Sequence, residues 1–283
     1  MKFLYKSIIL SCLFFSITSY AQIKGKCVDV FGKGVAYVNI SIKGKSIGTV
    51  SNQKGDFYLK NKSIKENDSL IFSHLNFNKK TVSIPLSNPE IELTPKVEAL
   101  EEIVISNKKR KFKIVGTRIE TRGDHRYAFK TRNRDKGNEI GKIIKVKKNK
   151  IYDLKNIQFY IERFGFKSAT FRINFYNIID GVVDLEKTNK TDLIYKIIGQ
   201  GIVKIDLSKQ HLSFSNNFIA SIEWINVEID HDIEEGWRQI FIPLVKDTGP
   251  MCSRSNVHQK WRIKRIQNNL GLGIHLEVTQ YSE

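Results

Sequence analysis

The chain has 283 residues, of which 41% are hydrophobic and 11% aromatic, with only 5 prolines. This composition is typical of a folded, β-rich protein and excludes an intrinsically disordered chain. Lys and Arg number 47 against 29 Asp and Glu, and the formal net charge of +18 favours polyanionic partners.

The N-terminus has the three parts of an export signal. Lys2 and Lys6 supply a positive start, an apolar run follows from Ile8 to Ile17, and Ser19-Tyr20-Ala21 forms a small-x-small cleavage site. The apolar run is too short to cross a bilayer as a helix. We therefore predict a signal peptide at residues 1–21 and an exported mature protein.

The chain has three cysteines. Cys12 lies inside the signal, and lipid attachment there is disfavoured because cleavage would leave almost no apolar region before it. Cys27 and Cys252 lie near opposite ends of the mature chain. An exported protein could pair them, but we favour two free or buried thiols because they fall in different predicted domains.

Residues 22–105 are predicted to form one small β-sandwich. Val38, Ile40 and Ile42 alternate on one face of a strand, and residues 52–56 provide a hairpin-like turn. Short strands with turn signals every eight to twelve residues are typical of a sandwich. The predicted strands are 23–30, 35–43, 47–51, 57–59, 69–73, 80–84 and 91–93.

The motifs of this unit occur in a fixed order. They are G-K-C-V-D-V-F-G-K-G-V-A-Y-V-N-I-S-I-K-G, S-I-G-T-V-S-N-Q-K-G-D-F, D-S-L-I-F-S-H-L-N-F and L-E-E-I-V-I. Over residues 23–105 this order resembles the carboxypeptidase D regulatory-like domain, a transthyretin-like sandwich. It is similar to the N-terminal extension of starch-utilisation-type TonB-dependent receptors of Bacteroidota. The resemblance implies a binding scaffold without chemistry of its own.

Two activities associated with that resemblance are not expected here. The receptors continue into a plug and a large membrane barrel, whereas only 178 residues follow residue 105 in this sequence. Transport is therefore not expected. Peptidase activity is not expected either, because the 6 histidines show no H-x-x-E or H-E-x-x-H spacing.

The basic excess is concentrated in residues 106–150, which hold 17 Lys and Arg against 4 Asp and Glu. The first part, residues 106–113, is polar and basic with no apolar face and is predicted to be a linker. Uncompensated charge at this density attracts polyanions. We therefore predict an anionic docking surface to which the following residues contribute: Lys108, Lys109, Arg110, Lys111, Arg132, Arg134, Lys145, Lys147 and Lys148.

Residues 114–283 are predicted to form a second domain, a jelly-roll-like β-sandwich without amphipathic helices. Several of its strands loosely resemble a C-terminal module found with the same accessory domain in Bacteroidota proteins, which implies no known site. The fold class is thus all-β with two sandwiches. The predicted strands are 140–146, 154–161, 169–178, 201–207, 218–227, 239–244 and 272–279.

Three groups of residues carry side chains suited to metal binding or catalysis. The acidic run Asp230–Glu235 has oxygen ligands at alternate positions but lacks the glycine of a calcium loop, so a solvated turn is favoured. His125 stands beside Asp124 without a nucleophile motif, which favours a polar loop. Cys252 and His258 lie in residues 246–260, which we interpret as a long connection suited to surface recognition. Metal binding or covalent chemistry there is the alternative.

Aromatic residues offer a different possibility, stacking on sugar rings. Trp224 lies within an apolar strand and is expected in the core, whereas Trp237 is the better candidate for a carbohydrate contact.

Together these features predict a non-catalytic exported accessory or adaptor protein, located in the periplasm and peripheral to the outer membrane. Its expected partner is an outer-membrane or envelope protein, or anionic lipid or lipopolysaccharide. Export argues against nucleic acid. We expect no catalytic residue, cofactor or metal. The alternatives are a carbohydrate-binding protein, by analogy of fold alone, and a hydrolase with an unrecognised site.

Overall fold

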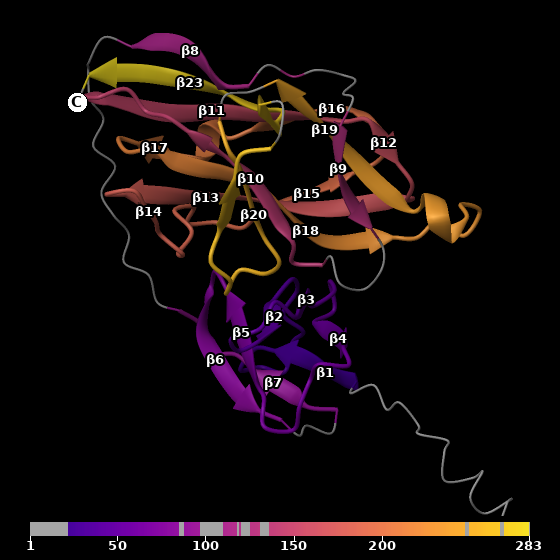
Figure 1. Ribbon diagram of the computed structural model, residues 1–283. Coiled ribbons are helices and arrows are strands. Elements are labelled where there is room, and N and C mark those ends of the chain that lie inside the picture. Colours follow the sequence, from indigo (N-terminus) through magenta and orange to yellow (C-terminus); the bar gives the residue numbers. More distant parts are fainter. Residues whose placement is uncertain are drawn as a thin grey trace, which may run out of the picture.

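The computed structural model describes residues 22–84, 88–96, 110–117, 119, 125–130, 136–246, 249–266 and 269–282. They form a smaller N-terminal unit, residues 22–96, and a larger C-terminal unit, residues 110–282 (Figure 1). The predicted signal peptide lies outside the described residues. The predicted all-β class is confirmed, because the described residues contain no α-helix; their short 3-10 turns include Ser208–Gln210 and Glu235–Trp237.

Two small sheets make up the N-terminal unit. The first has the order β4-β1-β7, in which β1 and β7 are parallel, and the second has the order β3-β2-β5-β6 with antiparallel pairs. All seven predicted strands of this unit are confirmed. They are β1 (Gln22–Val28), β2 (Asn39–Ile42), β3 (Gly48–Val50), β4 (Asp56–Lys60), β5 (Ser69–His74), β6 (Phe77–Ser83) and β7 (Glu90–Glu92).

The N-terminal core follows from the alternation that the sequence shows. In β4, Phe57 and Leu59 are buried while Tyr58 between them is only half-buried. Phe57 packs edge-on against Phe72 of β5, with ring centroids 5.6 Å apart. These side chains fill the space between the two sheets and stabilise them against each other.

The predicted turn before β4 is also confirmed. Asn52 Oδ1 accepts hydrogen bonds from the N–H groups of Lys54 and Asp56, at 2.8 and 2.9 Å. Gly55 has φ +88, and a Cβ there would lie 2.4 Å from the carbonyl oxygen of Cys27. Glycine is therefore required at this position both by the backbone conformation and by the close approach of β1.

Three antiparallel sheets, curled into a half-barrel, make up the C-terminal unit. The sheet nearest the N-terminal unit, here called the junction sheet, has the order β14-β13-β18-β10-β20-β21, with β15 paired to β13. Its strands are β10 (Glu139–Ile144), β13 (Ser168–Ile179), β14 (Val182–Val183), β15 (Leu193–Ile197), β18 (Phe218–Glu228), β20 (Met251–Arg254) and β21 (Arg262–Lys264).

The other two sheets form the far layer of this unit. The β11 sheet has the order β16-β11-β23-β8, with β17 paired to β11, and the β19 sheet has the order β12-β19-β22, with β9 paired to β19. Their strands are β8 (Lys111–Gly116), β9 (His125–Lys130), β11 (Lys150–Ile161), β12 (Arg163–Phe164), β16 (Gly201–Asp206), β17 (Ser213–Phe214), β19 (Gln239–Lys246), β22 (Leu270–Leu272) and β23 (Ile274–Ser282).

The main core lies between the junction sheet and the far layer. Trp224 is 1% exposed, as predicted for a core residue, and its ring is stacked on Phe129 with centroids 5.2 Å apart. In β13, Phe171 and Phe175 belong to this core, whereas Arg172 between them points to the other face of the junction sheet. That other face carries polar side chains and is turned toward the N-terminal unit (Figure 1).

Two predictions of the sequence analysis are corrected by the strand pairing. Residues 111–113 of the expected linker belong to β8, which pairs with β23 and therefore needs no apolar face of its own. The expected long connection 246–260 contains β20, which pairs with β10 and buries Cys252. Both strands are stabilised by pairing with strands that lie far away in the sequence.

No helix in the described part of the chain has the length and apolar character that a membrane crossing requires.

Candidate functional site

Five of the nine residues predicted for the anionic docking surface lie among the described residues, and all five are exposed. The other four, Lys108, Lys109, Arg132 and Arg134, lie outside the described residues. The five that can be placed are Arg110, Lys111, Lys145, Lys147 and Lys148.

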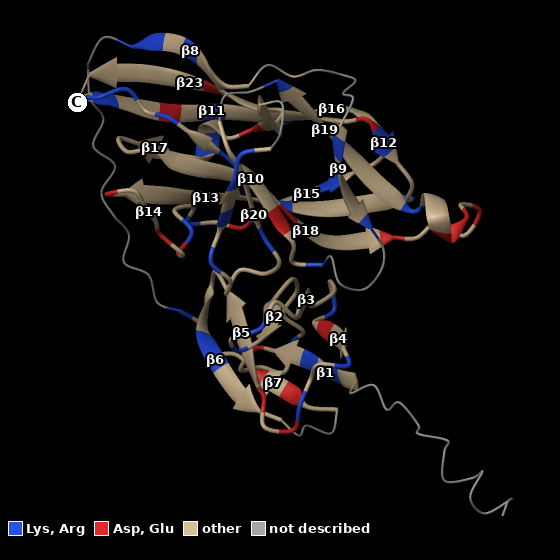
Figure 2. Cartoon of the chain, viewed as in Figure 1, with Lys and Arg blue, Asp and Glu red and all other residues tan. Residues whose placement is uncertain are grey.

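The strand register brings these five residues to one end of the β11 sheet. Lys111 at the start of β8 lies opposite Gln280 of β23, and Gln280 lies opposite Tyr152 near the start of β11. The connection from β10 to β11, residues 145–149, enters at the same end, next to the C-terminus (Figure 2). Strand pairing thus gathers cations that lie more than thirty residues apart in the sequence.

We call this region the basic end; it comprises Arg110, Lys111, Lys145, Lys147, Lys148 and Lys150. The Arg110 guanidinium carbon lies 5.9 Å from the centre of the Tyr281 ring, a cation–π distance. The ammonium of Lys150 donates to the Ser282 hydroxyl at 2.9 Å. The nearby Asp153 carboxylate accepts hydrogen bonds from Ser213 at 2.6 Å and from Tyr281 at 3.2 Å. The basic end is therefore ordered by aromatic and hydroxyl groups as well as by charge.

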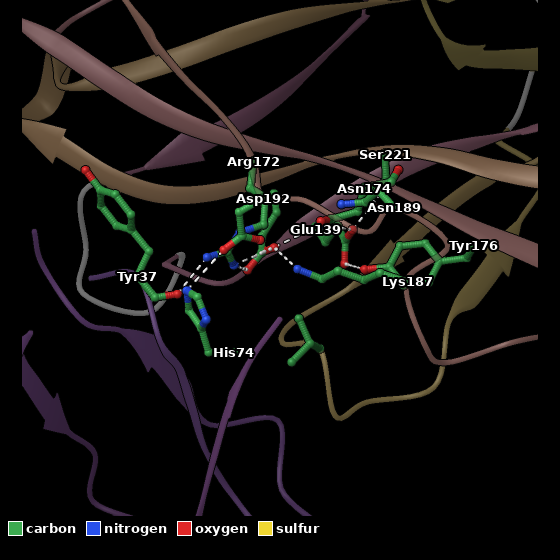
Figure 3. Close-up of polar contacts among 12 residues, drawn as sticks. Tyr37, His74, Glu139, Arg172, Asn174, Tyr176, Lys187, Asn189, Asp192 and Ser221 are labelled. Atoms are coloured by element: carbon green, nitrogen blue, oxygen red, sulfur yellow. Dashed lines mark hydrogen bonds and ion pairs between the residues drawn. The ribbon is translucent and has the colours of Figure 1, made fainter. Parts of the chain in front are cut away.

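A second group of ionisable side chains is buried on the face of the junction sheet that meets the N-terminal unit (Figure 3). Glu139 of β10 and Glu223 of β18 lie directly opposite each other, and both are 0% exposed. Each carboxylate has its own arginine. Arg254 Nε lies 2.7 Å from Glu139 Oε2, and Arg172 Nη1 lies 3.2 Å from both Glu223 oxygens.

Neutral groups complete the hydrogen bonding of the two carboxylates. Asn174 Nδ2 donates to Glu139 at 2.8 Å and to Glu223 at 2.9 Å, so that one amide links both acids. The Ser221 hydroxyl donates to Glu139 at 2.6 Å. Burial raises the pKa of Glu223, but the positive charges of Arg172 and Lys187 outweigh burial, and the net shift of that pKa is downward. Two like charges can coexist here because the counter-charges are equally buried.

This cluster also reaches the N-terminal unit. Arg172 Nη2 donates to the carbonyl oxygen of Tyr37 at 2.6 Å. The Asn39 amide lies between the same pair of charges; in the amide orientation that satisfies both, its nitrogen lies 2.7 Å from Glu223 Oε1 and its oxygen 2.9 Å from Arg172 Nη1. One arginine therefore joins a core strand of the C-terminal unit to the backbone of the N-terminal unit.

Asp192, just before β15, provides a second side-chain link between the units. His74 Nε2 lies 3.1 Å from Asp192 Oδ2, and Arg172 Nε lies 3.2 Å from Asp192 Oδ1. Burial opposes ionisation of Asp192, yet Arg172, His74 and Lys187 together hold its pKa below the usual value. Figure 3 shows Asp192 placed between His74 and Arg172.

The segment after β20 forms the third part of the junction. The Ser41 hydroxyl lies 2.6 Å from His258 Nδ1, and Gln259 Nε2 donates to the carbonyl oxygen of Lys45 at 2.9 Å. Burial, together with the charges of Lys79 and Arg254, lowers the pKa of His258 to about 4. His258 is therefore neutral at physiological pH and acts as a hydrogen-bonding residue of the junction.

A cavity of about 630 Å³ opens beside the junction. Lys24, Asp56, Tyr58 and Glu90 of the N-terminal unit line it together with Lys136 of the C-terminal unit. Lys136 donates to Asn226 Oδ1 at 3.2 Å, and burial lowers its pKa. Both lysines and carboxylates line this cavity, so its lining favours neither sign of ligand charge.

Cys27 and Cys252 are both free and buried, as favoured from the sequence. Burial raises the pKa of Cys27 to about 12, and it does the same for Cys252, whose pKa is lowered only in part by Lys142. At physiological pH both groups are thiols rather than thiolate nucleophiles. Within the described residues, no three His, Cys, Asp or Glu side chains are grouped as metal ligands.

The remaining candidates lie on the surface of the C-terminal unit. Trp237 is 51% exposed, and the Arg163 guanidinium carbon lies 3.8 Å from the centre of its ring. Residues 230–232 form an exposed turn in which Asp230 accepts a hydrogen bond from the Asp232 N–H. His125 is an exposed residue at the start of β9.

The sequence analysis did not single out the buried ion pairs. Arg172 and Glu223 occur in the strings F-R-I-N-F and S-I-E-W-I, where a charge stands between large apolar residues. That pattern is also typical of ordinary strand alternation. A charge in the middle of a strongly apolar strand could have indicated a buried ion pair, because a buried charge requires a partner.

Comparisons with known proteins identify one part of the chain. Residues 23–105 match the family model of the CarboxypepD_reg-like domain, so this part of the sequence is such a domain. No curated protein sequence gives a significant match.

The structural similarities are weak. The cysteine protease and lectin-like domains of Cwp84, a surface layer associated protein of Clostridium difficile, align at 9% identity and TM-score 0.36, over 57% of this chain and 37% of that chain. The major pilin subunit BcpA of Bacillus cereus aligns at 9% identity and TM-score 0.21, over 92% and 69% of the two chains. The protein of the IBDV viral particle aligns at 7% identity and TM-score 0.25, over 94% and 62%. This chain thus spans about a third of the length of the first of these structures.

Proposed function

We propose that the protein is a non-catalytic exported accessory or adaptor protein of the cell envelope that docks to an anionic partner through the basic end. The observation that carries this proposal is the convergence of Arg110 and Lys111 with Lys147 and Lys148 at one end of the β11 sheet. Convergent exposed cations raise the local positive potential more than the same charges spread along a chain.

The junction supports the proposal because an adaptor needs a body of defined shape. Arg172, His74 and His258 take part in contacts that join the two units through buried or half-buried groups. Groups buried between two units resist separation, since each would otherwise have to find water or another partner. The basic end is then presented at a fixed position relative to the N-terminal domain.

The envelope location rests on two features of the sequence. Residues 1–21 have the pattern of an export signal, and residues 23–105 resemble the N-terminal extension of TonB-dependent receptors of Bacteroidota. Anionic surfaces are abundant there, as lipid head groups, lipopolysaccharide phosphates and acidic faces of membrane proteins. Each cation held at an anionic membrane surface contributes up to about 1 kcal/mol.

The test is a comparison of two variants with equal charge loss. One carries Lys145→Gln, Lys147→Gln and Lys148→Gln, and its control carries Lys167→Gln, Lys196→Gln and Lys204→Gln, which neutralise three exposed lysines elsewhere on the C-terminal unit. The measurements are co-sedimentation with vesicles of neutral or anionic lipid and binding to isolated outer-membrane fractions. These two arms distinguish lipid from protein as the source of the negative charge.

We expect binding to anionic vesicles or outer-membrane fractions to require the basic end and to weaken steeply as the salt concentration rises. The Debye length falls from about 10 Å at 0.1 M to about 3 Å at 1 M, so exposed cations lose most of their reach over this range. The control variant should bind as the natural chain does. Binding that ignores salt, or that is equal in the two variants, would contradict the proposal.

A second candidate function, carbohydrate binding, is favoured by one observation. Trp237 is half-exposed and lies against Arg163, a combination able to stack on a sugar ring and hold its hydroxyls. Binding on a glycan array that is lost with Trp237→Ala and kept by the basic-end variant would support it over the adaptor proposal.

A further inference from the structure

Strand β8 lies at the outer edge of the C-terminal unit (Figure 1). It pairs with β23, and no other described strand pairs with it. An edge strand presents one row of backbone N–H and C=O groups to whatever lies beside it, which makes it a template for another strand.

The register identifies which backbone groups face outward. The Thr117 N–H donates to the carbonyl oxygen of Ile274, so the backbone of residue 117 faces β23. In an antiparallel pair this orientation alternates, and residues 111, 113 and 115 therefore also face β23. The N–H and C=O groups of Phe112, Ile114 and Gly116 point away from β23, toward the outer edge.

The side chains of the same strand are unusual for a solvent-exposed edge. Phe112 and Ile114 are each 62% exposed and alternate along one face of β8. Two large apolar side chains beside outward-pointing backbone groups are the arrangement by which an edge strand accepts an extended segment: the backbone supplies affinity and the side chains supply specificity.

The charge of this region indicates the sign of the partner. Lys111 and Lys113 are exposed on β8, and the basic end lies at the start of the strand. Glu277, which lies opposite Ile114, does not offset this charge, because its carboxylate accepts hydrogen bonds from Gln158 and Lys204. The strand therefore favours an acidic neighbour.

The same charge argues against two other occupants. A second copy of β8 would bring two sets of lysines together, and lysines on edge strands commonly prevent such self-pairing. An anionic membrane would satisfy the lysines, but it offers no strand to pair with the outward-facing backbone of Ile114.

We propose that β8 is a docking edge to which an extended acidic segment of a partner protein adds as a further strand of the β11 sheet. This inference rests on the proposed adaptor function and specifies its partner as a protein segment with acidic and apolar side chains in alternation.

The test uses one substitution that removes an outward N–H without touching the pairing to β23. Ile114→Pro does so, because proline is tolerated on the open side of an edge strand but donates no hydrogen bond. Ile114→Val is the matched control, since it keeps the N–H and the β-branched side chain. The probe is a short synthetic peptide of alternating Glu and Val, with a Lys and Val peptide as its counterpart.

Fluorescence polarisation should show that the full chain binds the Glu and Val peptide and does not bind the Lys and Val peptide. Ile114→Pro should weaken binding at least about tenfold, whereas Ile114→Val should change it less than about threefold. Amide hydrogen exchange should show new protection at residues 112, 114 and 116, while residues 113 and 115 are protected already in the free chain. Circular dichroism of Ile114→Pro checks that it folds.

Each of the following outcomes would contradict one part of the proposal. Failure of the acidic peptide to bind, or equal binding by Ile114→Pro, overturns strand addition. Protection of residue 114 that rises with protein concentration alone assigns the edge to a second copy and also overturns it. Salt-dependent binding to anionic vesicles by a chain that fails to bind the acidic peptide keeps the adaptor proposal and refutes only the docking edge. Peptide docking at β8 without any binding to vesicles or envelope fractions keeps the docking edge and refutes the adaptor proposal.

Discussion

Replacing Arg172 with Met should destabilise the C-terminal unit more than any exposed charge substitution. The Arg172 side chain is 1% exposed and lies beside Glu223 and Asp192, whose side chains are 0% and 12% exposed. Met has a similar reach but no charge, so both carboxylates would lose their main counter-charge without a path to water. Breaking a buried pair in this way costs about 3–5 kcal/mol.

The assay is urea unfolding followed by tryptophan fluorescence. All 3 tryptophans, at positions 224, 237 and 261, belong to the C-terminal unit, so the signal reports that unit alone. The matched control is Lys204→Met, which breaks the ion pair with Glu277 where the lysine side chain is 55% exposed. That change should cost at most about 1 kcal/mol.

A double variant separates lost charge balance from lost packing. Adding Glu223→Leu to Arg172→Met removes the most deeply buried of the two carboxylates, and part of the lost stability should return. If Arg172→Met costs no more than Lys204→Met, the ion pairs of the junction sheet do not stabilise the fold and the reasoning fails.

Three further predictions concern the junction and the thiols. Trypsin should cleave first within residues 106–110, before β8, and the two fragments should co-purify through the junction; a chain that resists cleavage there would contradict the two-unit division. Because the pKa of His258 is about 4 when folded and 6.5 ordinarily, the unfolded chain binds the proton first as pH falls. Stability should therefore drop between pH 6.5 and 4, on the order of 3 kcal/mol, and His258→Asn should flatten that part of the pH profile. Cys27 and Cys252 should react with a thiol reagent only at the rate of unfolding, since burial raises the pKa of each to about 12; fast labelling of the native chain would disprove this.

Much of the fold could be predicted from local pattern. Alternation of apolar and polar residues located the long strands β11, β13 and β18, and the Asn52–Asp56 turn was identified from its Asn and Gly. These features depend on residues close together in the chain, which is why the sequence alone suffices for them. Trp224 was predicted to lie in the core for the same reason.

The short edge strands could not be predicted in the same way. β8 contains K-F-K-I-V-G directly after a basic run, and its first three residues were assigned to a linker. What makes it a strand is a row of hydrogen bonds to β23, more than 150 residues later in the chain. A strand stabilised by a distant partner carries little local signal.

From its residue pattern alone, β13 is predicted to be a strand with an apolar face and a polar face. What the polar face meets depends on how the two units pack. Alternation is the same whether polar side chains face water or another protein surface, because it records the period of the strand and not its surroundings. The N-terminal unit contacts Arg172 through the carbonyl oxygen of Tyr37, and two other strands supply Glu139 and Glu223 as partners of Arg172 and Asn174. Likewise, the sequence showed that residues 106–150 are basic, but strand pairing chose which of those cations share one end of a sheet. The sequence sets the number of cations, whereas the pairing of strands sets their positions on the surface.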